Sequence, residues 1–387
     1  MSEKPKLKVL KEGDLEDKIS VLVGTRPSIV KMGPIIKELE KKDINSFVIH
    51  AGQHYSYNMD REFFEDLDLK EPEYLVESTK ECEYHGEQTA EMLKGIEKVL
   101  LNEKPKVILV CGDANFNLAG ALAGRKLRIK VGHVEAGLRS NDWRMPEEHN
   151  RVMIDHISDY LFAPTEEAKE NALKDNVKGE VFVTGNTIVD AVNQNLKIAE
   201  EKSQILEKLG LTEESYFVIT AHREENVDSK RNLSKLIETI EKIGENHQSS
   251  KIVYPVHPRT RKRLKEFELA DRAESIDKLN LMEPLGYLDF LKLLKNARLV
   301  LTDSGGIQEE SCIMQVPCVT LRENTERPET VEVGSNIVAG LEPSEVLKAT
   351  EEMLSRERNW KNPFGEGTAA ENIVKITTQS LTYKNKG

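Results

Sequence analysis

The sequence predicts an α/β protein with two domains, each built on an open parallel β-sheet. Short β-branched runs alternate with segments of helical period along the chain, which is the pattern of βαβ units. The chain has 387 residues, more than one ordinary hydrophobic core supports, so two domains are expected. A charged helical stretch without strand signal, residues 187–210, separates two sets of expected strands and is expected to connect the domains.

The first domain is expected to span residues 1–185 and the second residues 186–368. The expected strands of the first domain are residues 19–23, 46–50, 107–111, 130–134, 161–163 and 181–184. Those of the second domain are residues 216–220, 252–256, 299–302 and 318–321. The C-terminal segment 369–387, with helical spacing over most of its length, is expected to pack back on the first domain. Open α/β sheets bind ligands at the carboxyl ends of their strands, so two facing sheets would hold a ligand in the cleft between them.

Charge and composition argue against several kinds of partner. The formal net charge is −12 and no long Lys/Arg block occurs, so neither nucleic acid nor an anionic membrane is expected as a partner. No apolar run approaches the roughly 18 residues that span a bilayer. Residues 1–18 are mostly charged and lack the apolar centre of a signal peptide. The cysteines form no CxxC pair and are interpreted as reduced thiols of a cytoplasmic protein, not as a disulfide framework or zinc site.

Familiar cofactor motifs are missing from the sequence. It contains no Walker A motif and no HExxH motif. The only G-x-G-x-x-A match, residues 365–370, does not follow an expected strand, so it is not interpreted as a dinucleotide fingerprint. A nicotinamide-dependent mechanism therefore lacks support.

The segment TDSGGIQEE, residues 302–310, predicts a phosphate site. It follows the apolar run 297–301, and Gly305 and Gly306 are expected to turn the chain tightly into a helix. Backbone N–H groups at a helix start, beside the positive end of the helix dipole, bind phosphate well. Arginines in the segment RENTERPE, residues 322–329, could clamp a diphosphate. An isolated Gly-Gly turn usually only reverses the chain, but these charged neighbours favour a nucleotide-sugar site.

Charged residues follow several strands of the first domain. Arg26 and Lys31 lie in GTRPSIVK after the first strand and could face an anion, although a solvated helix start is an equal alternative. Asp113 in CGD and Glu135 in GHVEAGLR each follow a later strand. The alternative for these two acids is a surface-loop carboxylate. Carboxylates that converge beside cations could perform acid–base chemistry, because close like charges separate their pKa values.

Two further motifs complete the expected site. PEEHNR opens a helix in which Glu147 and Arg151, four residues apart, share a face. Glu148 is interpreted as a complement to the helix dipole. His222 in AHREEN directly follows the first strand of the second domain and could reach a phosphate or a sugar hydroxyl, with a solvated loop histidine as the alternative. His133 is expected to pack inside.

Taken in order, these motifs resemble the non-hydrolysing UDP-N-acetylglucosamine 2-epimerase family. GTRP, AGQH, HVEAGLRS, PEEHNR, TGNTIVDA, AHREEN, TDSGGIQEE and TERPE occur in the family's order, between about residues 19 and 367. The resemblance implies two Rossmann-like domains of the glycosyltransferase B type, assembled as a homodimer. It also implies cofactor-free interconversion of UDP-N-acetylglucosamine and UDP-N-acetylmannosamine. UDP would be eliminated to leave 2-acetamidoglucal and would then be added back after protonation of the opposite face.

The resemblance also assigns residues by matching positions. The implied catalytic residues are Asp113, Glu135, Glu147, Arg151 and His222. The first three would be the acid–base carboxylates, supported by the arginine, and the histidine would lie near the UDP phosphates. The implied substrate-binding residues are Arg26, Lys31, Phe290, Ser304, Gly305, Gly306, Glu310 and Arg327. Among them the glutamate would accept hydrogen bonds from ribose hydroxyls, and the phenylalanine would pack near uracil, with core packing as its alternative.

The sequence also departs from the family pattern. Ser28 stands where the family usually has Glu, and Glu224 replaces a common Arg after His222. Residues 55–57, after Gln53, lack the Arg and Gln with which some bacterial members bind a second, activating substrate, which argues against activation by substrate here.

Three other functions are compatible with parts of the pattern. They are a hydrolysing relative that releases free N-acetylmannosamine, a glycosyltransferase of the same fold, and a non-catalytic UDP-sugar binder. The three carboxylates argue against a binder, which needs neither acid nor base. PEEHNR together with AHREEN favours an epimerase over a transferase.

Overall fold

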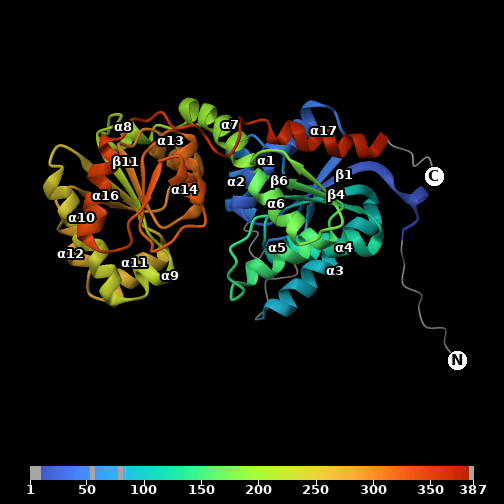
Figure 1. The fold of residues 1–387 in the computed structure, drawn as a ribbon, viewed down its shortest axis with the longest axis horizontal. Helices are drawn as coiled ribbons and strands as arrows, with labels where there is room; N and C mark the ends of the chain where they lie inside the picture. Colours follow the sequence, from blue (N-terminus) through green and yellow to red (C-terminus); the bar gives the residue numbers. More distant parts are fainter. Residues whose placement is uncertain (1–9, 53–56, 77–81, 83, 383–387) are drawn as a thin grey trace. The chain divides into compact units, whose positions relative to one another are not determined.

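The computed structural model describes residues 10–52, 57–76, 82 and 84–382. The sequence features at Gln53 and at residues 54–56 therefore lie outside the described residues, as do residues 1–9 and 383–387 of the two terminal segments. The chain forms two compact units, residues 1–191 with 364–387, and residues 192–363. Figure 1 shows a sheet with helices on both faces in each unit.

The first unit contains a seven-stranded parallel sheet with the order β3-β2-β1-β4-β5-β6-β7. Its strands are β1 (Glu16–Val23), β2 (Ser46–His50), β3 (Tyr74–Leu75), β4 (Pro105–Cys111), β5 (Lys130–Val134), β6 (Tyr160–Ala163) and β7 (Glu180–Val183). Its helices are η1 (Glu12–Asp14), α1 (Arg26–Lys41), α2 (Tyr57–Asp66), α3 (His85–Glu103), α4 (Asn115–Leu127), α5 (Pro146–Ile157), α6 (Glu166–Lys174) and α17 (Ala369–Thr382). Helix α17 contacts α1, while α4 contacts both α3 and α5.

The second unit contains a six-stranded parallel sheet with the order β10-β9-β8-β11-β12-β13. Its strands are β8 (Tyr216–Thr220), β9 (Lys251–Pro255), β10 (Leu279–Met282), β11 (Leu299–Thr302), β12 (Cys318–Thr320) and β13 (Asn336–Val338). Its helices are α8 (Ile205–Leu209), α9 (Glu224–Val227), α10 (Lys230–Asn246), α11 (Pro258–Glu266), α12 (Ala270–Glu274), α13 (Tyr287–Lys295), α14 (Gly305–Ile313), α15 (Pro328–Glu332) and α16 (Pro343–Ser355). Helix α7 (Thr187–Lys202) contains the boundary between the units.

The two strand orders confirm an α/β fold with two Rossmann-like domains. In each sheet the chain builds three strands outward and then returns to the first strand to build in the other direction. That reversal, between β1 and β4 and between β8 and β11, is the switch point at which ligands bind in such sheets. No helix in the described part of the chain is both long and apolar enough to cross a membrane.

The predicted helical stretch 187–210 is broken in the structure. Helix α7 ends at Lys202 and α8 begins at Ile205. Ser203 interrupts the run, because its Oγ accepts a hydrogen bond from the Ile205 backbone N–H at 3.3 Å and donates one to Asp289 at 2.5 Å. A serine that bonds locally to the backbone competes with the helix ladder.

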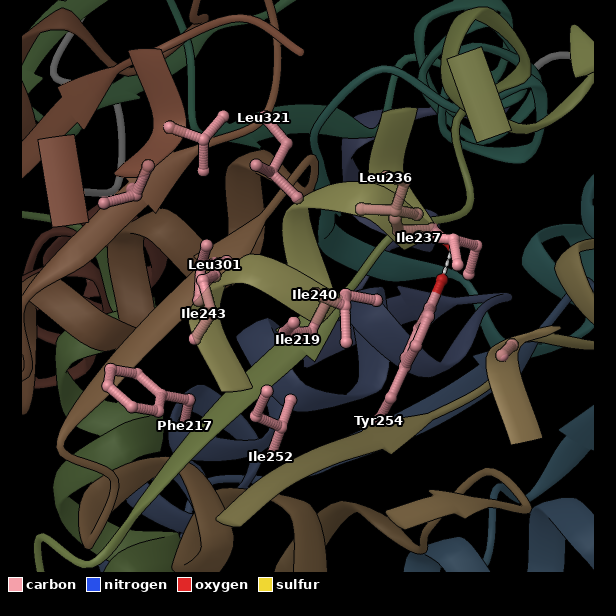
Figure 2. Close-up of a cluster of buried hydrophobic side chains, with 14 of the residues drawn as sticks. Phe217, Ile219, Leu236, Ile237, Ile240, Ile243, Ile252, Tyr254, Leu301 and Leu321 are labelled. Atoms are coloured by element: carbon pink, nitrogen blue, oxygen red, sulfur yellow. Dashed lines mark hydrogen bonds between the residues drawn. The ribbon is translucent and has the colours of Figure 1, made fainter. Parts of the chain in front are cut away.

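A buried apolar cluster in the second unit supports the loop that carries His222 (Figure 2). Helix α10 buries one face, including Leu236, Ile237 and Ile240, against β8 and β9. Each such side chain contributes roughly 1.5–3 kcal/mol through burial. At the edge of this cluster the Tyr254 hydroxyl donates a 2.9 Å hydrogen bond to the Ala221 carbonyl, immediately before His222.

Candidate active site

The first expected cation, Arg26, begins α1 and is exposed, with its guanidinium carbon 5.5 Å from the centre of the Phe63 ring. The preceding residue, Thr25, caps the helix. Its side chain accepts a hydrogen bond from the Ser28 backbone N–H at 3.4 Å, and Ser28 Oγ accepts one from the Thr25 backbone N–H at 3.0 Å. Ser28 thus completes a capping box, which is also a usual role of Glu at this helix position, so its departure from the family pattern keeps the helix start intact.

The second expected cation, Lys31, pairs with Glu135. Lys31 Nζ lies 2.7 Å from Glu135 Oε1 and 2.8 Å from Oε2, and the carboxylate is buried. Glu135 directly follows β5 and has a φ of 65°, a left-handed conformation that costs a non-glycine residue roughly 1–2 kcal/mol. The neighbouring ammonium favours the ionised carboxylate, which is the form that a general base needs.

Asp113 lies in the turn after β4 and pairs with Arg151 of α5. Arg151 Nη2 lies 2.5 Å from Asp113 Oδ2. The backbone of Asp113 is held as well, because Asn150 Nδ2 donates to the Asp113 carbonyl at 2.8 Å and also to Asn115 Oδ1 at 3.0 Å. Helix α5 therefore fixes both the side chain and the backbone of Asp113.

The turns that carry Asp113 and Glu135 lie next to each other at the carboxyl ends of β4 and β5. Cys111 Sγ is 3.9 Å from Glu135 Oε2, and a Cβ on Gly112 would lie 3.3 Å from the same oxygen. Burial, followed by the charge of Glu135, raises the pKa of the Cys111 thiol well above its usual value, so this thiol stays protonated beside the carboxylates. The structure thus brings together four predicted site residues at the carboxyl ends of the strands of the first sheet: Lys31, Glu135, Asp113 and Arg151.

The two glutamates of PEEHNR take different places. Glu147 is exposed, and its carboxylate makes no hydrogen bond or ion pair with any residue that the structure describes. Glu148 is buried and accepts hydrogen bonds from Ser140 N (2.9 Å), Ser140 Oγ (2.9 Å), Asn141 N (3.2 Å) and Arg151 Nη1 (2.9 Å). The sequence interpretation of Glu148 as a complement to the helix dipole missed this role. Glu148 anchors the loop before α5 and holds the arginine that faces Asp113.

We expect Glu148→Gln to lower the free energy of unfolding by about 2 kcal/mol, because the charge-assisted bonds weaken and an amide N–H₂ faces donors. Burial raises the pKa of this carboxyl, but hydrogen bonds from Ser140, Arg151 and Asn141 outweigh burial and lower it. A lowered folded-state pKa stabilises the protein above the unfolded value of about 4.3. The advantage of Glu148 should therefore disappear as pH falls below that value. Urea denaturation at pH 7 and pH 3.5 measures both effects.

Glu147→Gln is the matched control for this stability measurement. Its carboxylate is exposed on the same helical turn, so its effect on unfolding should stay within about 0.5 kcal/mol. Equal unfolding free energies of the two variants at pH 7 would contradict an anchoring role for Glu148.

In the second unit a buried carboxylate, Asp303, organises the loop of His222. Asp303 Oδ2 accepts hydrogen bonds from His222 N (2.9 Å), Arg223 N (2.9 Å) and Asn226 Nδ2 (3.0 Å). Its Oδ1 lies 3.4 Å from His222 Nδ1. The His222 ring also lies 5.3 Å from the ring of His257, whose pKa is lowered by burial and then by the nearby His222 and Arg259. Asp303 thus contacts both the backbone N–H and the ring of His222.

The expected phosphate site lies at the start of a helix, as predicted. Its two glycines, however, are not needed to turn the chain, contrary to the sequence prediction. Ser304 is the N-cap of α14, and its backbone N–H donates to Thr302 Oγ1 at 3.0 Å. Gly305 and Gly306 do not have positive φ, so the turn does not need them for its backbone conformation. A Cβ on either residue would meet only ordinary contacts. Their effect is to leave the first N–H groups of α14 without side chains in front of them, which permits close approach of a ligand.

The other residues expected around UDP lie near this helix. Glu310 is buried on α14 and accepts a hydrogen bond from the Tyr287 hydroxyl at 3.2 Å. Arg327 Nε lies 2.8 Å from Oε1 of the buried Glu309. Phe290 is half-buried on α13, the helix that also carries Tyr287. The contacts of Arg327 and Glu310 with neighbouring protein groups set their orientation.

The contacts of two arginines alter the diphosphate clamp that the sequence predicted. Arg322 is buried and lies 2.9 Å from Glu225 and 3.4 Å from Glu326. Glu224, where the family commonly has Arg, lies 2.9 Å from Arg259. The acids around TERPE and AHREEN therefore offset much of the local positive charge.

A family model described as UDP-N-acetylglucosamine 2-epimerase matches residues 37–378. A UDP-N-acetylglucosamine 2-epimerase of Methanocaldococcus jannaschii is 55% identical over 364 residues, which cover 93% of this chain and 99% of the relative. The chain belongs to the UDP-N-acetylglucosamine 2-epimerase family. The resemblance carried by its motifs is thereby confirmed.

Solved structures of 2-epimerases share the fold of this family member. The crystal structure of the M. jannaschii UDP-GlcNAc 2-epimerase in complex with UDP-GlcNAc and UDP has a TM-score of 0.83 at 55% identity, and the match covers 94% of this chain and 99% of that one. The UDP-GlcNAc 2-epimerase of Neisseria meningitidis bound to UDP-GlcNAc has a TM-score of 0.84 at 32% identity, covering 94% and 100%. The likeness therefore spans both Rossmann-like domains.

Proposed function

We propose that the protein interconverts UDP-N-acetylglucosamine and UDP-N-acetylmannosamine by epimerisation at C2. The substrate is supported by the 55% identity, over nearly the full length of the chain, to a protein named UDP-N-acetylglucosamine 2-epimerase. A similar solved structure holds UDP-GlcNAc and UDP. The observation that carries the chemistry is the pairing of buried Glu135 with Lys31, beside Asp113 and its Arg151. A UDP-sugar binder has no use for an ionised, buried carboxylate in a strained turn.

The proposed reaction begins with the loss of UDP. The C2 hydrogen is not acidic in the intact sugar, because no carbonyl neighbours that carbon in the ring. As the C1–O bond to UDP breaks, positive charge at C1 acidifies the C2–H bond. The proton then passes to a carboxylate, the electron pair of the C–H bond forms a C1=C2 double bond, and 2-acetamidoglucal and UDP result. Glu135, held ionised by Lys31, is suited to accept that proton.

The return steps require a proton on the opposite face and a retained UDP. A second carboxylic acid protonates C2, and a UDP oxygen bonds to C1 again. Glu135 then gives its proton to solvent and the second carboxylate takes one up, which restores both groups. Asp113 and Glu147 are the proposed partners of Glu135 in this exchange. On the UDP side we propose the start of α14 and His222 as phosphate contacts, with Arg26 and Arg327 as cations and Phe290 near uracil. Developing negative charge on UDP is stabilised by such fixed donors.

Two further predictions come from the sequence. The resemblance predicts a homodimer, and the cysteine usage predicts a cytoplasmic location; both stay predictions.

Incubation with UDP-N-acetylglucosamine in heavy water tests the proposed function. NMR should show both UDP-N-acetylhexosamine epimers with deuterium at C2 and no accumulating free hexosamine. Free N-acetylmannosamine would instead establish the hydrolytic reaction. Substrate that binds without exchange at C2 would indicate a glycosyltransferase or a non-catalytic binder. Adding a sugar acceptor distinguishes these two, because only a transferase moves the sugar to it.

A further inference from the structure

A buried histidine–aspartate pair lies behind the first-domain carboxylates. His133 of β5 and Asp155 of α5 are both fully buried, and His133 Nδ1 lies 2.6 Å from Asp155 Oδ1. On its other side His133 Nε2 lies 3.1 Å from the Gly112 carbonyl, in the turn that carries Asp113. Neither residue is among those proposed to touch substrate.

The same aspartate reaches the turn that carries Glu135. Asp155 Oδ2 accepts hydrogen bonds from the Gly137 backbone N–H at 3.1 Å and from Arg139 Nη2 at 2.7 Å. One connected chain of hydrogen bonds thus runs from Gly112 through His133 and Asp155 to Gly137.

Both ring nitrogens of His133 face oxygen atoms that can accept hydrogen bonds, the Asp155 carboxylate at Nδ1 and the Gly112 carbonyl at Nε2. Burial raises the pKa of the Asp155 carboxyl, but its interactions with His133 and Arg139 outweigh burial and hold the pKa below its usual value. Arg139 in turn donates from Nε to Asp175 at 2.9 Å. Arg139 thus lies between two carboxylates, and buried charges are tolerated when they are paired in this way.

Both turns contain residues in the left-handed region, which is strained for Glu135 but not for the two glycines. Gly112, Glu135 and Gly137 have φ values of 76°, 65° and 78°, all in the left-handed region. Strained backbone persists where its surroundings determine it, and such residues cluster at functional sites. The two turns are anchored here to one buried pair, at the carbonyl of one and the N–H of the other.

We propose that His133 and Asp155 form a positioning pair that holds Asp113 and Glu135 at one fixed spacing. This inference rests on the proposed function, because it gives the pair a role only through those two carboxylates. A displacement of a catalytic group by about 1 Å can lower the rate roughly 100-fold without loss of substrate affinity. Loss of the pair should therefore lower kcat and leave UDP binding largely intact.

Two substitutions of His133 test its two hydrogen bonds separately. The His133→Asn amide can occupy the place of Nδ1 and reach Asp155, whereas the His133→Gln amide can occupy the place of Nε2 and reach the Gly112 carbonyl. Each variant should lower kcat about 10- to 100-fold, with KM and the UDP Kd changed less than about threefold. Asp155→Asn should retain most of the activity, because its amide N–H₂ can donate to His133 Nδ1 while its oxygen still accepts from the Gly137 N–H. Asp155→Ala should lose at least about 100-fold.

Asp190→Asn provides the matched structural control. Asp190 is another buried aspartate of the first unit, and it accepts backbone hydrogen bonds from Ala369 at 3.2 Å and Ala370 at 3.1 Å at the start of α17. Its variant should lose stability comparably and keep kcat within about threefold, since its bonds do not involve the two turns.

Steady-state kinetics, calorimetric UDP binding and urea unfolding of all variants decide the inference. Folded His133 variants with kcat no lower than that of Asp190→Asn would overturn it. So would a loss that appears only in KM, or an Asp155→Asn variant as impaired as Asp155→Ala. A wild-type protein without C2 exchange would remove the proposed function itself, whereas an active wild type with unimpaired variants would remove only the positioning pair.

Discussion

Replacing Glu135 with Gln is expected to lower kcat roughly 1,000-fold, because removal of a general base costs about 10²–10⁴-fold in rate. The substitution keeps the shape of the side chain and removes the charge that Lys31 contacts at 2.7 Å. An amide cannot accept the C2 proton, so deuterium exchange at C2 should fall in parallel with epimerisation. UDP binding should change less than about threefold, since Glu135 itself is not among the proposed nucleotide contacts. NMR exchange and titration calorimetry measure the two quantities.

Glu103→Gln is the control for loss of a comparable ion pair. Glu103 of α3 lies 3.1 Å from Lys18, near the starts of β1 and β4 and thus at the opposite edge of the same sheet. The variant should keep kcat within about twofold, because a partly exposed pair away from the site contributes little. A Glu135→Gln enzyme that retains more than a tenth of wild-type exchange would remove Glu135 from the role of base.

Gly137→Ala is expected to destabilise the first domain by about 3 kcal/mol or more, from backbone overlap and a left-handed φ. The added Cβ would lie 1.9 Å from the Ala168 carbonyl oxygen and 2.6 Å from its carbonyl carbon, and Gly137 has a φ of 78°. Backbone atoms cannot rotate away as a flexible side chain could. The turn after Glu135 would have to shift, so epimerisation should fall as well. Urea unfolding followed by circular dichroism measures the loss.

Gly185→Ala separates backbone strain from overlap. Gly185 lies in the same unit with a φ of 86°, yet its added Cβ would meet only ordinary contacts at 3.6 Å. It should lose about 1–2 kcal/mol, the cost of the left-handed conformation alone. Equal losses in the two variants would show that the 137–168 contact relaxes without cost.

The interior strands could be predicted from the sequence, whereas some edge strands could not. β2, β5, β8 and β11 begin and end at the predicted residues, because buried parallel strands appear as continuous apolar runs. The strands β3, β10 and β13 were not predicted, and each lies at an edge of its sheet. In β13 the most buried residue is Asn336, whose side chain bonds to Thr320 and Thr330. A buried amide with polar partners gives no apolar signal.

The position of each candidate site residue was predictable, but its partner was not. Asp113 and Glu135 follow β4 and β5 as expected, since motifs after strands meet at one edge of a parallel sheet. The Lys31–Glu135 contact joins residues 104 apart in the chain, and spacing does not reveal such pairs. Asp303 was missed although one signal was present, because it follows β11 as Asp113 follows β4.

The edge strands β3, β7, β10 and β13 contain only two, four, four and three residues. Such short borders offer few open N–H and C=O groups to another polypeptide, which is one way in which proteins discourage aggregation through added strands. A homodimer of this chain would therefore associate through helical surfaces, and neither sheet would continue across the dyad.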